Sequence, residues 1–442
     1  MMAYKFSALL MAALLPAALW AQSQSFSLSE ALQYGVEHNT KVQSAALDVE
    51  DAQATVDNRI SSGLPQINGS IDYQNFFKLP TSLIPAEFFG GEPGDFIPVQ
   101  FGTEQNVTVG ISASQLIFNG AWLVGVSAAR TYVGLVESQQ KLSEQEVKQN
   151  VETAYYSVLI AKEFESLLQK NIDNLNKVYV EVDAMLKQGF VEEIDLDRLT
   201  ISKATLETQL ANAKRQTGVA EAYLKFSMGL DMATPITLTD ALPSMQDADD
   251  AAVNANNYLN RPEFTILNTL VALNEYNVRV NKAMYLPTVA LYGQYNTNAQ
   301  RNAFNFFSSG EPWFQVGLVG VKMDIPIFSG MQRQSNVTSA QVGLEKARLD
   351  QQNATQGILL EIQKTQTDYT NAIADLETQQ KNIELAQKIY NTALIKYREG
   401  VGSSLELNNA ESTLYGAQGN YIASLYNVLT AKTALTKSLG NY

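Results

Sequence analysis

Two long stretches of the chain carry apolar residues at every seventh position. The first runs through Val147, Ala154, Ala161, Leu168, Leu175 and Val182, and the second through Ile362, Tyr369, Leu376, Ile383, Tyr390 and Tyr397. A sustained seven-residue repeat keeps one narrow seam of a helix against a partner helix, which is the pattern of a coiled coil. The repeat therefore predicts helices over residues 119–188 and 330–399, both much longer than the helices of ordinary globular domains.

In the segments that precede each long helix, apolar residues recur at every second position rather than at every seventh. Four segments alternate apolar with polar residues, at about 66–77, 104–118, 288–298 and 313–328. Alternation predicts strands with one apolar and one polar face. Each segment has about the 9–11 residues that a tilted strand needs to cross a bilayer, or a few more. By itself, the alternation fits a half-buried soluble sheet equally well.

The same order of patterns occurs twice in the chain. Leu64-Pro65 recurs as Leu286-Pro287, Ile117-Phe118-Asn119-Gly120 as Ile327-Phe328-Ser329-Gly330, and Gly189 as Gly400. We therefore predict an internal two-fold repeat, with the first copy over 22–240 and the second over 241–442. In each copy a helix (about 26–62 or 250–285) precedes the strands. A last helix (190–229 or 403–439) follows the long one.

The first 21 residues differ from the rest in composition. Lys5 precedes an apolar run from Phe6 to Leu19, and a small residue at Ala21 fits a cleavage site, so we predict a signal peptide over 1–21. No later segment has about 18 uninterrupted apolar residues, so we expect no transmembrane helix in the mature chain. The chain has no cysteine, which excludes a disulfide scaffold and an acylated N-terminal cysteine, so we expect that it is not a lipoprotein.

The formal net charge of −14, from 45 acidic and 31 basic residues, disfavours nucleic acid as a partner. His38 is the one histidine, and the sequence does not give it the several converging ligands that a metal site needs. We find no nucleophile–base pair and no phosphate-binding loop. The sequence therefore predicts no catalytic residue, no metal site and no cofactor, and the protein is expected not to be an enzyme.

Helix lengths and strand number together predict self-association. The helix before the first strand pair and the helix after Gly189 have together about the length of one long helix, at a rise of about 1.5 Å per residue. Each copy is then expected to supply one continuous helical column and one column made of two helices. Four strands cannot close a barrel, since small barrels need about eight, and open strand edges are not tolerated in lipid. The chain must therefore complete its sheet with other copies of itself.

Together these features resemble the TolC family of outer-membrane efflux proteins, over essentially all of the chain after residue 21. The clearest match lies at the two helical hairpin tips, in segments 189–196 and 397–415. The resemblance implies an α+β membrane protein with a transmembrane β-barrel shared between three protomers, four strands from each, and a long antiparallel α-helical coiled-coil barrel. It implies a homotrimer in contact with outer membrane lipid in a Gram-negative bacterium, extending into the periplasm. As the exit duct of a tripartite efflux or type I secretion system, it would bind a periplasmic adaptor protein and an inner-membrane transporter.

The resemblance also implies a periplasmic gate at the tips. Glu406 falls where the family has a carboxylate facing the closed entrance. Asp195 and Tyr397 fall where the family has a hydrogen bond that keeps the tips shut. The chain departs from the family at Asn409, in place of a second carboxylate, and at Gly402, in place of a latching arginine. We assign the gate to Asp195, Tyr397, Glu406 and Asn409.

The hairpin turns themselves are the expected docking site for the adaptor. Gly189 and Gly400 fit the glycine that commonly ends a helix in a left-handed conformation. Phe190 and Val401 follow these glycines, so we assign the docking tips to these four residues.

Two other functions stay open. A secreted coiled-coil structural or adhesive protein would explain the seven-residue repeats but would leave the paired strands without a purpose. A plain porin or receptor would need many more strands in one chain.

Overall fold

A computed structural model describes residues 24–242 and 257–442 of the chain. The predicted signal peptide and the beginning of the helix expected at 250 lie outside this part. The chain divides into two compact units. The helical unit comprises the described residues of three segments: those up to Val49, those within 135–268 and those from Asp350 on. The sheet unit comprises residues 50–134 and 269–349.

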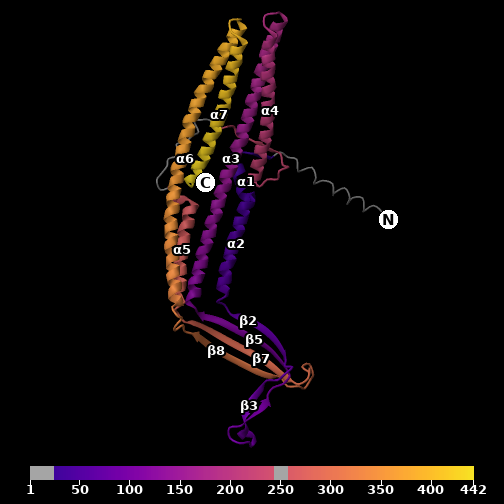
Figure 1. The fold of residues 1–442 in the computed structure, drawn as a ribbon, viewed down its shortest axis with the longest axis vertical. Helices are drawn as coiled ribbons and strands as arrows, with labels where there is room; N and C mark the ends of the chain where they lie inside the picture. Colours follow the sequence, from indigo (N-terminus) through magenta and orange to yellow (C-terminus); the bar gives the residue numbers. More distant parts are fainter. Residues whose placement is uncertain (1–23, 243–256) are drawn as a thin grey trace, which may run out of the picture. The chain divides into compact units, whose positions relative to one another are not determined.

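The helices and strands follow one another in nearly the predicted order (Figure 1). The helices are α1 (Leu28–His38), α2 (Thr40–Ser61), α3 (Gly120–Lys187), α4 (Glu193–Met228), α5 (Pro262–Ala283), α6 (Gln332–Arg398) and α7 (Ser404–Ser438), with short 3₁₀ helices at Ala86–Phe89 and Asn257–Asn260. The strands are β1 (Gln24–Phe26), β2 (Gln66–Asn75), β3 (Thr81–Pro85), β4 (Phe96–Gln100), β5 (Gln105–Phe118), β6 (Ile236–Leu238), β7 (Thr288–Arg301) and β8 (Phe314–Asp324).

The seven-residue repeats form the core of the helical unit, as predicted. Buried positions of the repeats include Val147, Ala154, Leu168, Leu175 and Val182 on α3 and Ile362, Tyr369, Leu376, Tyr390 and Tyr397 on α6. They belong to two clusters of buried side chains that α4 and α7 complete. Within this unit α3 forms a hairpin with α4, and α6 forms a hairpin with α7 (Figure 1).

The predicted helix over 26–62 is wrong in one respect, because it is broken at Asn39. The backbone of Asn39 is extended, with φ −67° and ψ 128°. Its side-chain Oδ1 accepts a hydrogen bond from Lys41 N at 2.8 Å, and its Nδ2 donates to the Ser227 carbonyl on α4 at 2.8 Å. An asparagine can satisfy free backbone groups at a helix start in this way. Asn39 therefore ends α1, starts α2 and joins both to α4.

Four further strands were not predicted. β1 and β6 form a parallel two-stranded sheet in the helical unit, with Gln24 opposite Ile236. β3 and β4 form an antiparallel hairpin inside the loop between β2 and β5. Each of these strands has only three to five residues, too few to show an alternating pattern.

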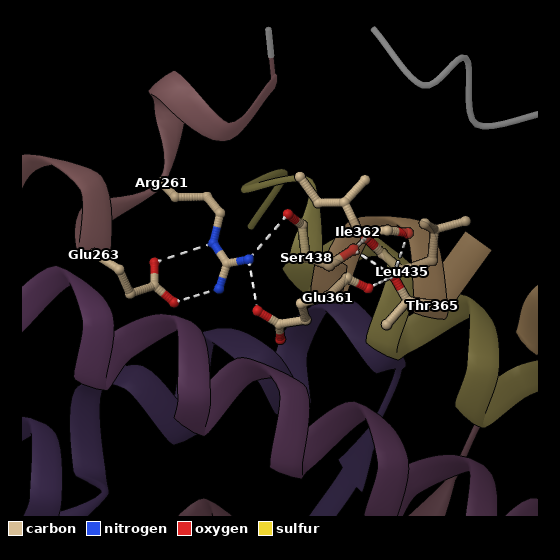
Figure 2. Close-up of polar contacts among 7 residues, drawn as sticks. All are labelled: Arg261, Glu263, Glu361, Ile362, Thr365, Leu435 and Ser438. Atoms are coloured by element: carbon tan, nitrogen blue, oxygen red, sulfur yellow. Dashed lines mark hydrogen bonds and ion pairs between the residues drawn. The ribbon is translucent and has the colours of Figure 1, made fainter. Parts of the chain in front are cut away.

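A buried arginine joins three helices of the helical unit (Figure 2). The Arg261 side chain, just before α5, is only 3% exposed and contacts Glu263 at 2.7 Å and Glu361 of α6 at 2.8 Å. Its Nη1 also donates to the Ser438 carbonyl at the end of α7, at 3.3 Å. Burial lowers the pKa of Arg261, but its hydrogen bonds to the two carboxylates outweigh burial and raise the pKa above its ordinary value. The arginine therefore stays charged and fixes the start of α5 to α6 and α7.

The sheet unit is built on an antiparallel sheet in the order β2-β5-β7-β8. Its register places odd-numbered residues of neighbouring strands opposite one another. Ile71 pairs with Val109, and Leu291 pairs with Val321. One face is thus mainly apolar and carries Ile67, Ile71, Tyr73, Val107, Val109, Ile111, Val289, Leu291, Tyr295, Val319, Val321 and Met323. The other face is mainly polar and carries Asn68, Ser70, Asp72, Asn106, Thr108, Ser112, Gln294, Asn296, Asn298 and Lys322.

Much of the apolar face of this sheet is open to solvent. Ile71 is 79% exposed and Val321 is 68% exposed. The outer strands β2 and β8 each pair on one side only within the described residues. Two of the strands are shorter than predicted, since β2 ends at Asn75 rather than 77, and β8 ends at Asp324 rather than 328. Pro326, which has no N–H to donate to a ladder, lies just beyond β8.

None of the helices in the described residues is both long enough and apolar enough to span a membrane.

Candidate functional site

Both hairpin tips end their first helix in the same way. After α3, Gly189 has φ +77°, its N–H donates to the Leu186 carbonyl, and Phe190 N donates to the Met185 carbonyl. After α6, Gly400 has φ +70° and donates to Tyr397, while Val401 N donates to Lys396. This pair of bonds is the Schellman motif, which needs a left-handed residue at the position that glycine occupies here. The sequence assignment of the two glycines as helix caps is confirmed.

The residues after these glycines are apolar and point into solvent. Phe190 is 73% exposed and Val401 is 78% exposed. In many Schellman motifs the residue at this position packs back onto its own helix. At these tips the two side chains remain free to contact another molecule.

Two side-chain contacts, which the sequence did not predict, join one hairpin to the other. The Arg398 guanidinium of α6 donates two hydrogen bonds to the Glu181 carboxylate of α3, at 2.8 and 2.9 Å. Arg198 of α4 donates to the Ser404 hydroxyl of α7 at 2.6 Å. Each pair is separated by more than 200 residues, so no local pattern could have indicated these contacts. We refer to them as the tip contacts.

Gly402 has a steric reason to differ from the arginine of the TolC pattern. A Cβ atom added at Gly402 would lie 2.9 Å from Cβ of Lys396 and 3.1 Å from the backbone nitrogen of Tyr397. The Gly402 N–H also donates to the Lys396 carbonyl at 3.0 Å. The turn is therefore too tight at this position for a larger side chain.

Glu406 and Asn409 lie in the first turns of α7. The Ser403 hydroxyl caps this helix by accepting from Glu406 N at 3.1 Å. The Glu406 carboxylate contacts the Lys396 ammonium at 2.9 Å, and both side chains are about half exposed. Asn409 is exposed. Within one chain, the charge of Glu406 therefore has a partner that the sequence analysis did not anticipate.

Tyr397 and Asp195 lie in the same region but bond differently from the predicted latch. The Tyr397 hydroxyl is buried and has no hydrogen-bond partner within the described residues. The Asp195 carboxylate accepts from Glu192 N at 3.4 Å and lies 3.6 Å from Arg198. Burial raises the pKa of Tyr397, and the charge of Asp195 adds to this effect. The assignment of both residues to a gate stays a prediction.

The chain as a whole, rather than the tips alone, matches a known family of transport proteins. The outer membrane efflux protein family matches residues 31–230 and 257–441. The chain belongs to this family. Outer membrane efflux protein BepC of Brucella suis is 24% identical over 338 residues, which cover 75% of this chain and 72% of BepC. Alkaline protease secretion protein AprF of Pseudomonas aeruginosa is 21% identical over 332 residues, 68% of each protein.

The fold is also shared with solved channels. The structure of the Campylobacter jejuni CmeC outer membrane channel superposes with a TM-score of 0.74 at 18% identity, over 94% of this chain and 85% of that one. Membership of the outer membrane efflux protein family makes the tips candidate elements of a transport path. Within the described residues, no group of three or more His, Cys, Asp and Glu could hold a metal ion.

Replacing Tyr397 by phenylalanine tests whether its hydroxyl forms a bond in the assembled protein. An unpaired buried hydroxyl contributes no favourable bond, so Tyr397→Phe should leave the thermal unfolding midpoint of the purified protein unchanged or raise it. Tyr155→Phe is the matched control, because the Tyr155 hydroxyl donates to Phe26 O and Asp240 Oδ2, both at 3.0 Å. We expect the control to destabilise by about 1 kcal/mol. A fall in the midpoint for Tyr397→Phe would show that other copies of the chain provide a partner.

Proposed function

We propose that this chain is one of three copies that form the exit duct of a tripartite efflux or type I secretion system. The duct would cross the outer membrane of a Gram-negative bacterium as a closed β-barrel and continue through the periplasm as a barrel of helices. The observation that carries the proposal is the exposed apolar face of a sheet with two unpaired edges. The secreted structural or adhesive alternative accounts neither for this face nor for the family match.

The sheet supports the membrane part of the proposal. An apolar face turned outward and a polar face turned inward are what a transmembrane barrel needs, and an open edge would leave backbone groups unpaired in lipid. Pairing β2 of one copy with β8 of the next would close the sheet. Four strands from each of three copies give the number that the resemblance to the TolC family implies.

The helical unit supports self-association as well. Large apolar side chains remain exposed on α4 (Ile201, Val219 and Phe226) and on α6 (Leu360, Leu385 and Ile389). Exposed apolar side chains on two different helices favour a ring of copies, because each copy then packs one of these helices against the other helix of its neighbour. The same side chains would line the contacts between protomers.

The tips support docking of a periplasmic adaptor and a gate. Phe190 and Val401 offer apolar contacts at rigid turns, and the adaptor would connect the duct to an inner-membrane transporter. The names of BepC and AprF suggest efflux and protease secretion as the two kinds of system. The absence of cysteine supports a duct without a lipid anchor.

The gate would be formed by Glu406 with Asn409, Asp195 and Tyr397, held by the tip contacts. The exposed ion pair between Arg398 and Glu181 contributes at most about 1 kcal/mol, so it favours a closed entrance without preventing it from opening.

Matched arginine substitutions on the two faces of β2 test the membrane assignment. Ile71→Arg places a charge on the apolar face and should cost about 2–4 kcal/mol if this face meets the bilayer midplane. Ser70→Arg adds the same charge to the polar face and should be tolerated. The measurement is the amount of heat-resistant oligomer in the outer membrane fraction. Equal yields of the two variants would contradict the assignment.

Substitution of both tip side chains tests docking. Phe190→Asp combined with Val401→Asp should abolish co-purification with the co-expressed adaptor and reduce export of a dye substrate at least tenfold, because a charge replaces each apolar contact. Phe307→Asp, at a residue that is 92% exposed in the loop between β7 and β8, is the control and should preserve both. Normal co-purification of the double variant would place the docking site elsewhere.

Charge substitutions at the gate should change ion selectivity in opposite directions. Glu406→Gln should weaken cation preference in planar bilayers, since it removes a negative charge from the entrance. Lys396→Gln should strengthen cation preference, since it leaves Glu406 without its partner. The measurement is the reversal potential in a salt gradient. Unchanged potentials in both variants would remove Glu406 from the ion path.

Arg398→Ala provides the control for this gate experiment. It breaks the contact with Glu181 but leaves Glu406 and Lys396 in place. It should raise the open fraction of the channel without changing its selectivity.

A further inference from the structure

A cavity of about 850 Å³ lies between α3, α4 and α7 in the helical unit. Phe164 and Leu167 of α3 form its apolar wall. Polar side chains from α4 and α7, among them Ser202, Gln209 and Asn408, form the opposite wall. The cavity is large enough for several water molecules and offers them hydrogen-bond partners.

A buried carboxylate, that of Glu411 on α7, borders this cavity. Glu411 is only 3% exposed. The Tyr415 hydroxyl donates to its Oε1 at 2.8 Å, and Ser202 of α4, which lines the same cavity, is near enough to act on its pKa. No Lys, Arg or His of the described residues forms an ion pair with it. The carboxyl group of α7 thus lies beside α4 with neutral side chains as its neighbours.

The ionisable groups around Glu411 do not compensate its charge. Tyr415 shares its helix, and Tyr390 faces it from α6. Burial and the charge of Glu411 raise the pKa of Tyr390 to about 12, so this phenol is neutral. Arg398 of α6 and Glu181 of α3 also act on Tyr390, but they bond to each other.

Burial of an uncompensated carboxylate favours its protonated form. Burial outweighs the opposite effects of Tyr415 and Ser202 and raises the pKa of Glu411. If α7 moved away from α4, water would reach the group and its pKa would return toward about 4.3. The stability that Glu411 gives to the packed helices is therefore complete below the ordinary pKa. It is lost as pH rises through the higher pKa of the packed state.

We infer that Glu411 is a proton-dependent contact that holds α7 against α4. With its proton, it can donate to Ser202 while it accepts from Tyr415, and the two helices stay packed. Without the proton, the buried charge favours separation of the helices, which lets water reach the carboxylate. Both helices begin at the hairpin tips, so this contact deepens the gate proposed above and rests on it: acid favours the closed state and alkali loosens it.

The distance between α4 and α7 tests this inference directly. The natural chain has no cysteine, so Thr208→Cys and Thr413→Cys, at exposed positions on the two helices, can be spin-labelled without further changes. Labelled chains diluted into unlabelled ones report the distance within one chain, measured by pulsed electron resonance from about pH 5 to about pH 9. We expect a narrow distribution at low pH that broadens and lengthens as pH rises.

In the same labelled chain, Glu411→Gln should keep the narrow low-pH distribution throughout, because glutamine imitates the protonated acid. Glu207→Gln, at an exposed carboxylate on α4, is the matched control and should retain the natural pH dependence. A distance that does not change with pH in the natural sequence would overturn the inference. The same pH dependence in Glu411→Gln would overturn it as well.

Tyr415→Phe provides a second, independent test of the Glu411 contact. The Tyr415 hydroxyl stabilises the charged carboxylate, so its removal should move the midpoint of the transition to higher pH. If Glu411→Gln fails to assemble, an unchanged midpoint in Tyr415→Phe overturns the inference. The distances are measured on purified protein without an adaptor. A distance that does not depend on pH would therefore contradict the Glu411 contact and leave the proposed duct intact. If the protein formed no duct, the same distance would still report on the contact.

Discussion

In the proposed duct the sheet enters a bilayer, where the backbone groups at its edges must find partners, and the rest of the proposed assembly follows from that constraint. Within the described part of one chain, β2 and β8 offer such edges, and the register of the sheet brings most apolar side chains of its four strands to one face. Copies that close the sheet satisfy both requirements at once. In the helical unit, the exposed apolar side chains of α4 and α6 offer a second surface for the proposed association between copies.

The helical unit combines a partly buried attachment with a more exposed one at the tips. Arg261 is itself buried and has two carboxylate partners, of which Glu361 is 43% exposed, so each pair is worth less than the about 3–5 kcal/mol of a fully buried pair. At the tips, the Arg398–Glu181 pair is about half exposed on both sides and is worth about 1 kcal/mol at most. The Glu411 contact adds a dependence on pH to the same region.

Periodicity explains how much of the fold the sequence could predict. The seven-residue repeats indicated the core of α3 and α6, and alternation indicated the four strands of the large sheet, because both patterns extend over many residues. The break at Asn39 was missed because it depends on a hydrogen bond to Ser227 on another helix. Strands β1, β3, β4 and β6 were missed because they are too short to show a period.

The candidate site was predictable only where a local turn defines it. Gly189 and Gly400 followed from helix-capping chemistry, whereas the bond between Arg398 and Glu181 joins residues 217 positions apart. Lys396, the partner of Glu406, is only ten residues away, but the turn that brings the two together is not visible in the sequence. Gly402 was recognised as a departure, and its reason, the close approach of the Lys396 backbone, appeared only in three dimensions.

In the proposed duct a single chain is incomplete, and three copies make one channel. Native mass spectrometry of the protein extracted from outer membranes in mild detergent measures the number of copies. We expect a single species with the mass of three mature chains, which separates only when the protein is unfolded. A stable, membrane-inserted single chain that conducts ions would contradict it.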